Sequence, residues 1–182
     1  MDMPQSLHEI LGEQQSKLAL FGITAFTLLG SVLVFILMHY QMSEQSYMWW
    51  QYVLGGLIII DIIAGTAANF TRGTNHYYAC RARSRWVFIA IHIHLIVVAV
   101  LFEQPLIQAL YIWSYVIISA CILNALFDKR IQRFLAMILV SIGLVLIVGL
   151  ASMWWYKTVA ALFLVKVCYA FAVDHYDIKS PT

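Results

Sequence analysis

The sequence predicts an all-α fold, a polytopic membrane helical bundle of six transmembrane helices that forms a single integral-membrane domain over residues 1–182. The first observation is composition, because 63% of the residues are hydrophobic and only 11% are charged, against about 45–50% and about 25% in soluble domains. The second is length, because six apolar runs approach the roughly 20 residues that a helix needs to cross the hydrocarbon. The third is continuity, since the runs do not alternate with a period of two, which favours helices over a β-barrel.

The same figures exclude several classes of function. The mean hydropathy of +0.83 excludes a soluble enzyme and a disordered chain. A formal net charge of only +2 provides no strongly basic surface, so we expect no nucleic-acid partner. The expected surroundings of the chain are the lipid bilayer.

The expected elements follow in chain order. Residues 4–17 are predicted to form a short interfacial helix, since Ser6 and Glu9 have the spacing of a capping box. Pro105 precedes the fourth span, at the position where a helix tolerates proline best. None of the predicted spans carries an internal proline, so the sequence contains no signal for a broken helix. The predicted spans cover residues 18–39, 48–69, 86–102, 106–127, 134–153 and 158–173.

The positive charges predict the orientation. Outside the spans, nine Lys and Arg residues lie on the side of the two termini and one lies on the other side. The positive-inside rule therefore predicts a multi-pass protein of the inner (cell) membrane with both termini in the cytoplasm. Both termini can share one side only if the number of spans is even, which agrees with six.

Four ionisable side chains lie inside predicted spans, where each costs a few kcal/mol unless it faces protein or water. They are Asp61, His92, His94 and Lys166. At about 1.5 Å per residue, all four lie about 10–14 Å from the cytoplasmic boundary. The matched depth predicts an ion pair between Asp61 and Lys166, beside which a histidine would titrate near neutral pH and pass protons. The alternative, a structural pair that fixes the register of two helices, stays open.

The two histidines are separated by one residue. On a helix, His92 and His94 are therefore about 200° apart, so a regular helix cannot aim both rings at one metal ion. We predict no metal site from this pair, and the sequence identifies no cofactor.

The fourth span carries a polar stripe at helical spacing. Its members are Ser114, Cys121, Asn124 and Asp128. The stripe descends toward the cytoplasmic boundary and could line a water-filled path to the ionisable layer, which makes Asn124 a candidate residue for substrate binding or proton handling. The alternative is that these side chains only form hydrogen bonds between helices.

The connection between the second and third spans, residues 69–85, is the longest and most polar. Its guanidinium groups match the geometry of phosphate and carboxylate, so it is a candidate site for an anionic lipid headgroup or a small anionic ligand. The alternative is that these residues only set the topology and contact anionic lipid. The residues concerned are Arg72, His76, Arg81, Arg83 and Arg85.

Three functional hypotheses follow. The first is a small transporter or proton-handling protein that uses the ionisable layer of Asp61, Lys166 and a histidine. The second is a non-catalytic subunit or assembly factor that binds a membrane-protein partner through faces of small residues. The third is a membrane-embedded enzyme that acts on an amphiphile at the cytoplasmic face, with His76, His92 or His94 in acid–base roles. Whether the protein is an enzyme stays open at this stage, and the first hypothesis is preferred.

Overall fold

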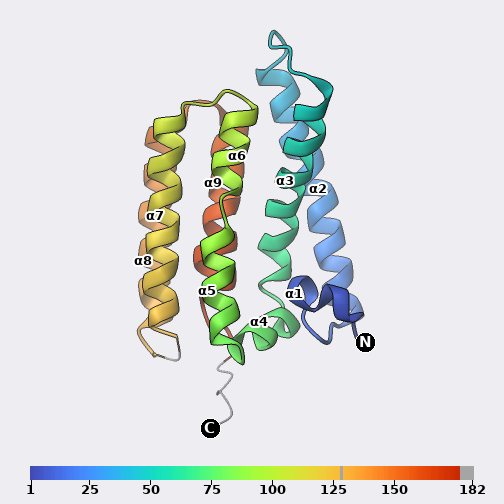
Figure 1. Cartoon of the computed structure of the whole chain (residues 1–182), viewed down its shortest axis with the longest axis vertical. Helices are drawn as coiled ribbons and strands as arrows, with labels where there is room; N and C mark the ends of the chain where they lie inside the picture. Colours follow the sequence, from blue (N-terminus) through green and yellow to red (C-terminus); the bar gives the residue numbers. More distant parts are fainter. Residues whose placement is uncertain (128, 177–182) are drawn as a thin grey trace.

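The computed structural model describes residues 1–127 and 129–176, and this part of the chain is built from helices without a β-strand (Figure 1). In chain order the elements are the 3-10 turn η1 (Gln5–Leu7), α1 (His8–Leu11), α2 (Lys17–Gln41), α3 (Trp49–Ala68), α4 (Arg72–Ala79), α5 (Ala82–Ile91), α6 (His94–Leu101), α7 (Leu106–Ala125), α8 (Gln132–Leu150), α9 (Trp154–Leu164) and the π-helix η2 (Val165–Phe171).

Five helices of the described chain are long and apolar enough to cross a membrane. They are α2, α3, the pair α5–α6 taken together over Ala82–Leu101, α7 and α8. These agree with the first five predicted spans, although the third begins at Ala82 instead of residue 86. The sixth predicted span, residues 158–173, differs because α9 ends after 11 residues and the chain continues with π-helical winding at Val165.

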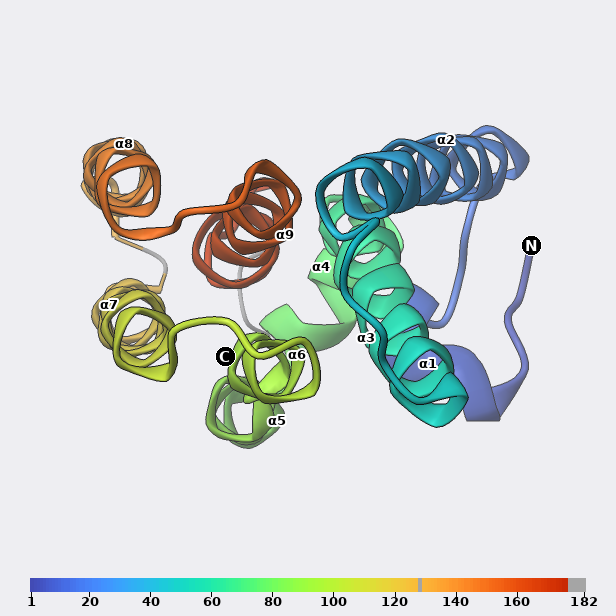
Figure 2. The same ribbon diagram turned by 90° about the horizontal axis from the view of Figure 1, so that it is seen from above.

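The segment made of α9 and η2 occupies the centre of the bundle. Seen from above, α9 lies between the α2–α3 pair and the α7–α8 pair, with α5 and α6 beside it (Figure 2). The side chains of Trp155, Tyr156 and Phe163 are almost completely buried there. By contrast, α2 lies at the edge and exposes most of its apolar residues, such as Leu29 at 73%. A chain of this kind keeps its polar groups inside and presents apolar side chains to lipid.

The short elements α1 and α4 lie together at one end of the bundle, which we call the α4 end (Figure 1). The interfacial helix expected over residues 4–17 is shorter than predicted, because Gly12 has a φ of +72° and ends α1. The expected capping role of Ser6 is also wrong, since the N-cap residue is Pro4 and carries no side-chain cap hydrogen bond. Ser16 instead caps α2, accepting a hydrogen bond from the amide of Ala19 at 3.0 Å.

Two glycines allow residues 1–16, here called the N-terminal segment, to pack on α4. A Cβ atom added at Gly12 would lie 2.2 Å from the carbonyl oxygen of Gly73. A Cβ atom added at Gly73 would lie 2.0 Å from the carbonyl oxygen of Gln14. The side-chain amide of Gln15 also stabilises the contact, because it donates a hydrogen bond to the hydroxyl of Thr71 at 2.5 Å. Backbone meets backbone here, so no side chain larger than hydrogen fits at either glycine.

Gly12→Ala is expected to release the N-terminal segment from α4. A residue with a Cβ loses about 1–3 kcal/mol at the φ of 72° and ψ of 179° that Gly12 adopts, and the clash with Gly73 adds to that loss. Hydrogen exchange of residues 1–16 should accelerate in the variant. The control is Gly22→Ala in α2, where a Cβ would meet nothing within 4 Å. Unchanged protection of the segment in Gly12→Ala would show that this close contact does not hold it.

Candidate functional site

The third candidate membrane span, Ala82–Leu101, is broken halfway, between α5 and α6. His92 has φ −80° and ψ 71°, and Ile93 has φ −94° and ψ 5°, so neither residue continues α5. The carbonyl of His92 instead accepts a hydrogen bond from the indole Nε1 of Trp113 in α7, at 2.8 Å. The expectation of unbroken spans was wrong because the break needs no proline: a distant side chain satisfies the backbone group that it frees.

The break changes the relation between the two histidines. Instead of pointing in opposite directions, the rings of His92 and His94 lie with their centroids 5.0 Å apart. The prediction that the two would face apart was therefore wrong, since it assumed a regular helix. The ring of His92 is held by its Nδ1, which is bonded to the carbonyl of Phe88. That bond makes Nδ1 the protonated nitrogen of a neutral His92 and leaves Nε2 as its basic atom.

One carboxylate oxygen of Asp61, which lies in α3, is close to two side-chain nitrogen atoms. The Nζ atom of Lys166 lies 2.7 Å from Oδ2 of Asp61, and it also approaches the Asp61 carbonyl at 3.3 Å. The Nε2 atom of His94 lies 3.6 Å from the same Oδ2. The Lys166 side chain is only 4% exposed, whereas that of Asp61 is 54% exposed. The structure thus brings together Asp61, Lys166, His94 and, through ring contact, His92.

The backbone of two helices is adapted to this ion pair. Lys166 lies in the π-helix η2, a winding that is rare and found frequently at functional sites. Its side chain crosses α3 at Gly65, where an added Cβ would lie 2.3 Å from Cε of Lys166. Gly65 therefore gives the lysine stem room to reach Asp61. The sequence analysis did not single out Gly65 for this role, and its only signal was a small residue one turn from Asp61.

The ion pair lies in a groove of about 370 Å³, which we call the Asp61 groove. Asp61, His94 and Lys166 form its polar wall, while Val87 and Ile91 of α5 are among its apolar lining. The volume is within the range of ligand-binding pockets, about 300–1,000 Å³. The groove therefore combines an apolar lining with a few polar groups that converge, which is the usual character of a small-molecule site.

The N-terminal segment forms part of this groove at the α4 end. Glu9 and Ile10 of α1 line it, and the hydroxyl of Tyr78 in α4 donates to the carbonyl of Glu9 at 2.9 Å. Burial, followed by the charge of Glu9, raises the pKa of Tyr78. The phenol therefore stays protonated and keeps donating this bond. The groove has α1 as its floor at the α4 end.

Asn124 does not take part in the groove. Its Oδ1 accepts a hydrogen bond from Nε of Arg85 at 2.9 Å, and both side chains are buried. Arg85 also donates to the carbonyls of Tyr78 and Ala79, at 3.0 and 2.9 Å, and stacks on Phe127. Asn124, a member of the polar stripe, therefore joins α7 to α5. Asp128, the last member of the predicted stripe, lies outside the described residues.

The five residues predicted as one anion site are not brought together. Instead of a loop, they lie on and around α4 and α5. Arg72 and His76 line a large groove between α4 and the N-terminal segment, of about 1020 Å³. Arg81 pairs with Glu13 at 2.7 Å. Arg83 lines the Asp61 groove, and Arg85 is buried as described above. Helix formation over residues 72–91 spreads these side chains around two axes, which sequence spacing in an assumed loop could not anticipate.

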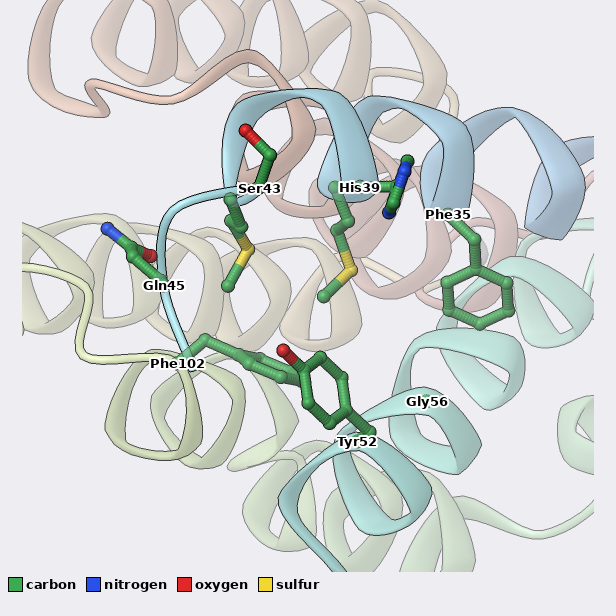
Figure 3. Close-up of a pocket in the computed structure, with 9 residues that line it drawn as sticks. Phe35, His39, Ser43, Gln45, Tyr52, Gly56 and Phe102 are labelled. Carbon is green, nitrogen blue, oxygen red and sulfur yellow. The ribbon is translucent and has the colours of Figure 1, made fainter. Parts of the chain in front are cut away.

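A further pocket, of about 460 Å³, lies near the loop between α2 and α3 at the opposite end of the bundle (Figure 3). Phe35, Tyr52 and Phe102 give it aromatic walls, and His39 lies at its edge on α2. The hydroxyl of neighbouring Tyr47 donates to the carbonyl of Phe102 at 3.2 Å. The sequence analysis did not single out this pocket, because Phe102 is distant in the chain from the other residues that line it.

In residues 1–127 and 129–176 there is no group of three or more His, Cys, Asp and Glu side chains that could hold a metal ion. Comparison with protein-family models, with curated proteins and with solved structures found no match. The chemistry of the site therefore has to be inferred from its own residues.

Proposed function

We propose that the protein carries protons, or a small solute together with protons, across the membrane, and that Asp61 is the carboxylate that exchanges the proton. The single observation behind the proposal is that one oxygen of Asp61 is shared by Lys166 at 2.7 Å and His94 at 3.6 Å. While Asp61 is ionised, it stabilises the buried ammonium group. When Asp61 takes up a proton, Lys166 loses its partner, and the two helices that carry them become free to move.

The charged and titratable groups that share the groove with Asp61 come from several other elements. Lys166 is contributed by η2, His94 by α6, and Arg83 by α5, while Glu9 lies on α1. His94 is the neighbour placed to pass a proton, because its Nε2 lies 3.6 Å from Oδ2 of Asp61. Its Nδ1 is buried and has no hydrogen-bond partner among the described residues.

The irregular helices support a transport role. Non-helical backbone at membrane depth is tolerated where it is buried in protein or lines a cavity, and transporters commonly use such discontinuous helices at their binding sites. Both the break at His92–Ile93 and the π-helix η2 lie beside the Asp61 groove. Two irregular segments at one ion pair favour a site that changes conformation over a purely structural pair.

The proposal includes a topology of six spans with both termini in the cytoplasm of a cell whose inner membrane holds the protein. In it, α9 and η2 together make the sixth crossing, and the α4 end faces the cytoplasm. The count of nine cytoplasmic Lys and Arg residues against one outside supports this orientation. Asp61 would then exchange its proton in the cytoplasmic half of the membrane.

Proton flux in liposomes tests the proposed function. Purified protein is reconstituted with a pH-sensitive dye inside the vesicles, and the decay of an imposed pH gradient is followed. We expect Asp61→Asn to reduce the protein-dependent flux at least tenfold, because the amide cannot take up a proton. The control is Glu44→Gln, a neutralised acid in the exposed loop between α2 and α3. Wild-type flux from correctly inserted Asp61→Asn protein would refute the proposal.

A further inference from the structure

We propose that the Asp61 groove binds an amphiphile with an anionic headgroup, which enters sideways from the bilayer between α3 and α5. The inference rests on the proposed function, because it names the class of molecule that the proton-exchanging centre meets. Three features carry it: the direction in which the groove opens, an arginine at its polar end that makes no bond with the described residues, and an exposed apolar edge.

The groove opens toward the side of the bundle. α3 packs against α6 and η2, but beyond the break the space between α3 and α5 forms the groove. Figure 1 shows α3 and α5 at the front of the molecule, with α1 at the foot of α3. Since α1 is the floor at the α4 end, the open side faces the hydrocarbon that surrounds a membrane bundle. A molecule already dissolved in the bilayer can therefore enter without crossing the floor.

Arg83 supplies an uncommitted positive charge at the α4 end of the groove. It lies in the first turn of α5 and makes no ion pair or hydrogen bond with the described residues. Its neighbours differ, because Arg81 is paired with Glu13 and Arg85 is bonded to Asn124. A guanidinium of this kind binds phosphate or carboxylate oxygens with charge-assisted hydrogen bonds.

Other polar groups at this end are consistent with an anion held on the α5 side. Ser84, next to Arg83, adds a hydroxyl donor to the lining. Glu9, the acidic side chain at the same end, comes from the α1 floor. The hydroxyl of Tyr78 is already committed to the backbone of Glu9. The headgroup is therefore assigned to Arg83 and Ser84.

The edge of the groove on α5 is formed by apolar side chains that are largely exposed. Val87 and Ile91, one and two turns beyond Arg83, are 52% and 61% exposed, and both line the groove. From Arg83 to Ile91 the helix rises about 12 Å, which takes a bound tail from the level of the headgroups toward the middle of the bilayer. This is the direction of an acyl chain in the cytoplasmic leaflet, so an amphiphile can enter without turning over.

Direct binding of amphiphiles tests the inference. Native mass spectrometry of the full chain in detergent would compare phosphatidylglycerol and palmitate, both anionic, with phosphatidylcholine. We expect either anionic amphiphile to bind at least tenfold more tightly than phosphatidylcholine, and the tighter of the two identifies phosphate or carboxylate as the preferred headgroup. Equal binding of all three would overturn the proposal.

Two variants with matched controls locate the site. Arg83→Gln is expected to weaken binding of the anionic amphiphile about tenfold, whereas Arg130→Gln, on the exposed loop between α7 and α8, leaves it unchanged. Val87→Trp should block the groove, whereas Val100→Trp, at an equally exposed valine of α6, should not. Binding that survives Arg83→Gln or Val87→Trp, or that inorganic phosphate displaces at equal concentration, would contradict an amphiphile in this groove.

The binding readout separates this inference from the proposed function. We expect Asp61→Asn to retain binding of the anionic amphiphile while it loses proton flux. If flux depends on Asp61 but no anionic amphiphile binds, only the present inference fails. If the amphiphile binds as expected but flux does not depend on Asp61, the proton-exchange proposal fails instead.

Discussion

Asp61→Asn is expected to destabilise the protein by about 3 kcal/mol, measured as a lower midpoint of unfolding in detergent. Removing one partner of a buried ion pair leaves the other charge uncompensated, which typically costs about 3–5 kcal/mol. The lower end of that range applies because the Asp61 side chain faces the open groove at 54% exposure, whereas Lys166 is 4% exposed. The loss therefore comes from the ammonium of Lys166, which no longer has a negative charge beside it.

A second substitution distinguishes the charge from the shape of the site. Lys166→Met in the Asp61→Asn background removes the unpaired ammonium while keeping a long unbranched side chain over Gly65. We expect the double variant to recover most of the lost stability, because replacing both members of a buried pair is often neutral. If the double variant is as unstable as Asp61→Asn, the instability does not come from an uncompensated lysine.

Arg85→Ala is expected to cost about 4 kcal/mol, the largest effect of a single substitution that we predict. The change removes the donor for the carbonyls of Tyr78 and Ala79 and for Oδ1 of Asn124. Each buried acceptor left unsatisfied costs about 1–3 kcal/mol. The stacking of the guanidinium on Phe127, at 3.7 Å from the ring centroid, is lost as well.

The neighbouring arginine is the matched control. Arg83→Ala removes the same side chain two residues earlier in α5, at a site that is exposed and makes no bond with the described residues. Its effect on stability should stay within about 0.5 kcal/mol. Chemical denaturation of both variants in detergent measures the difference. Similar losses in the two would show that Arg85 does not hold α4, α5 and α7 together.

The apolar spans could be predicted from the sequence because hydrocarbon thickness sets the length of a helix. Five of the described helices confirm this, and the all-helical class with them. The depth of Asp61 and Lys166 could be estimated because rise per residue depends little on sequence. The contact between them could only be proposed, since it also requires the rotation of two helices about their axes.

Other features of the site depend on residues that are distant in the chain, and sequence reasoning missed them. The break at His92–Ile93 is stabilised by Trp113 on another helix, so no residue near it in the sequence predicts it. The arginines predicted as one anion site lie apart because α4 and α5 form where a loop was expected. The floor of the groove requires Gly12 and Gly73 to meet, although 60 residues lie between them. The pattern of residues along the sequence does not reveal contacts between residues that are so distant in the chain.

Proton flux in the double variant Asp61→Asn/Lys166→Met is the most direct test of the central claim, that the Asp61 carboxylate exchanges protons and does more than join two helices. The variant keeps a folded bundle and an intact groove, so a loss of flux cannot be attributed to unfolding. We predict flux at the level of protein-free liposomes together with near-normal stability. Wild-type flux from this variant would contradict the account and assign the pair a purely structural role.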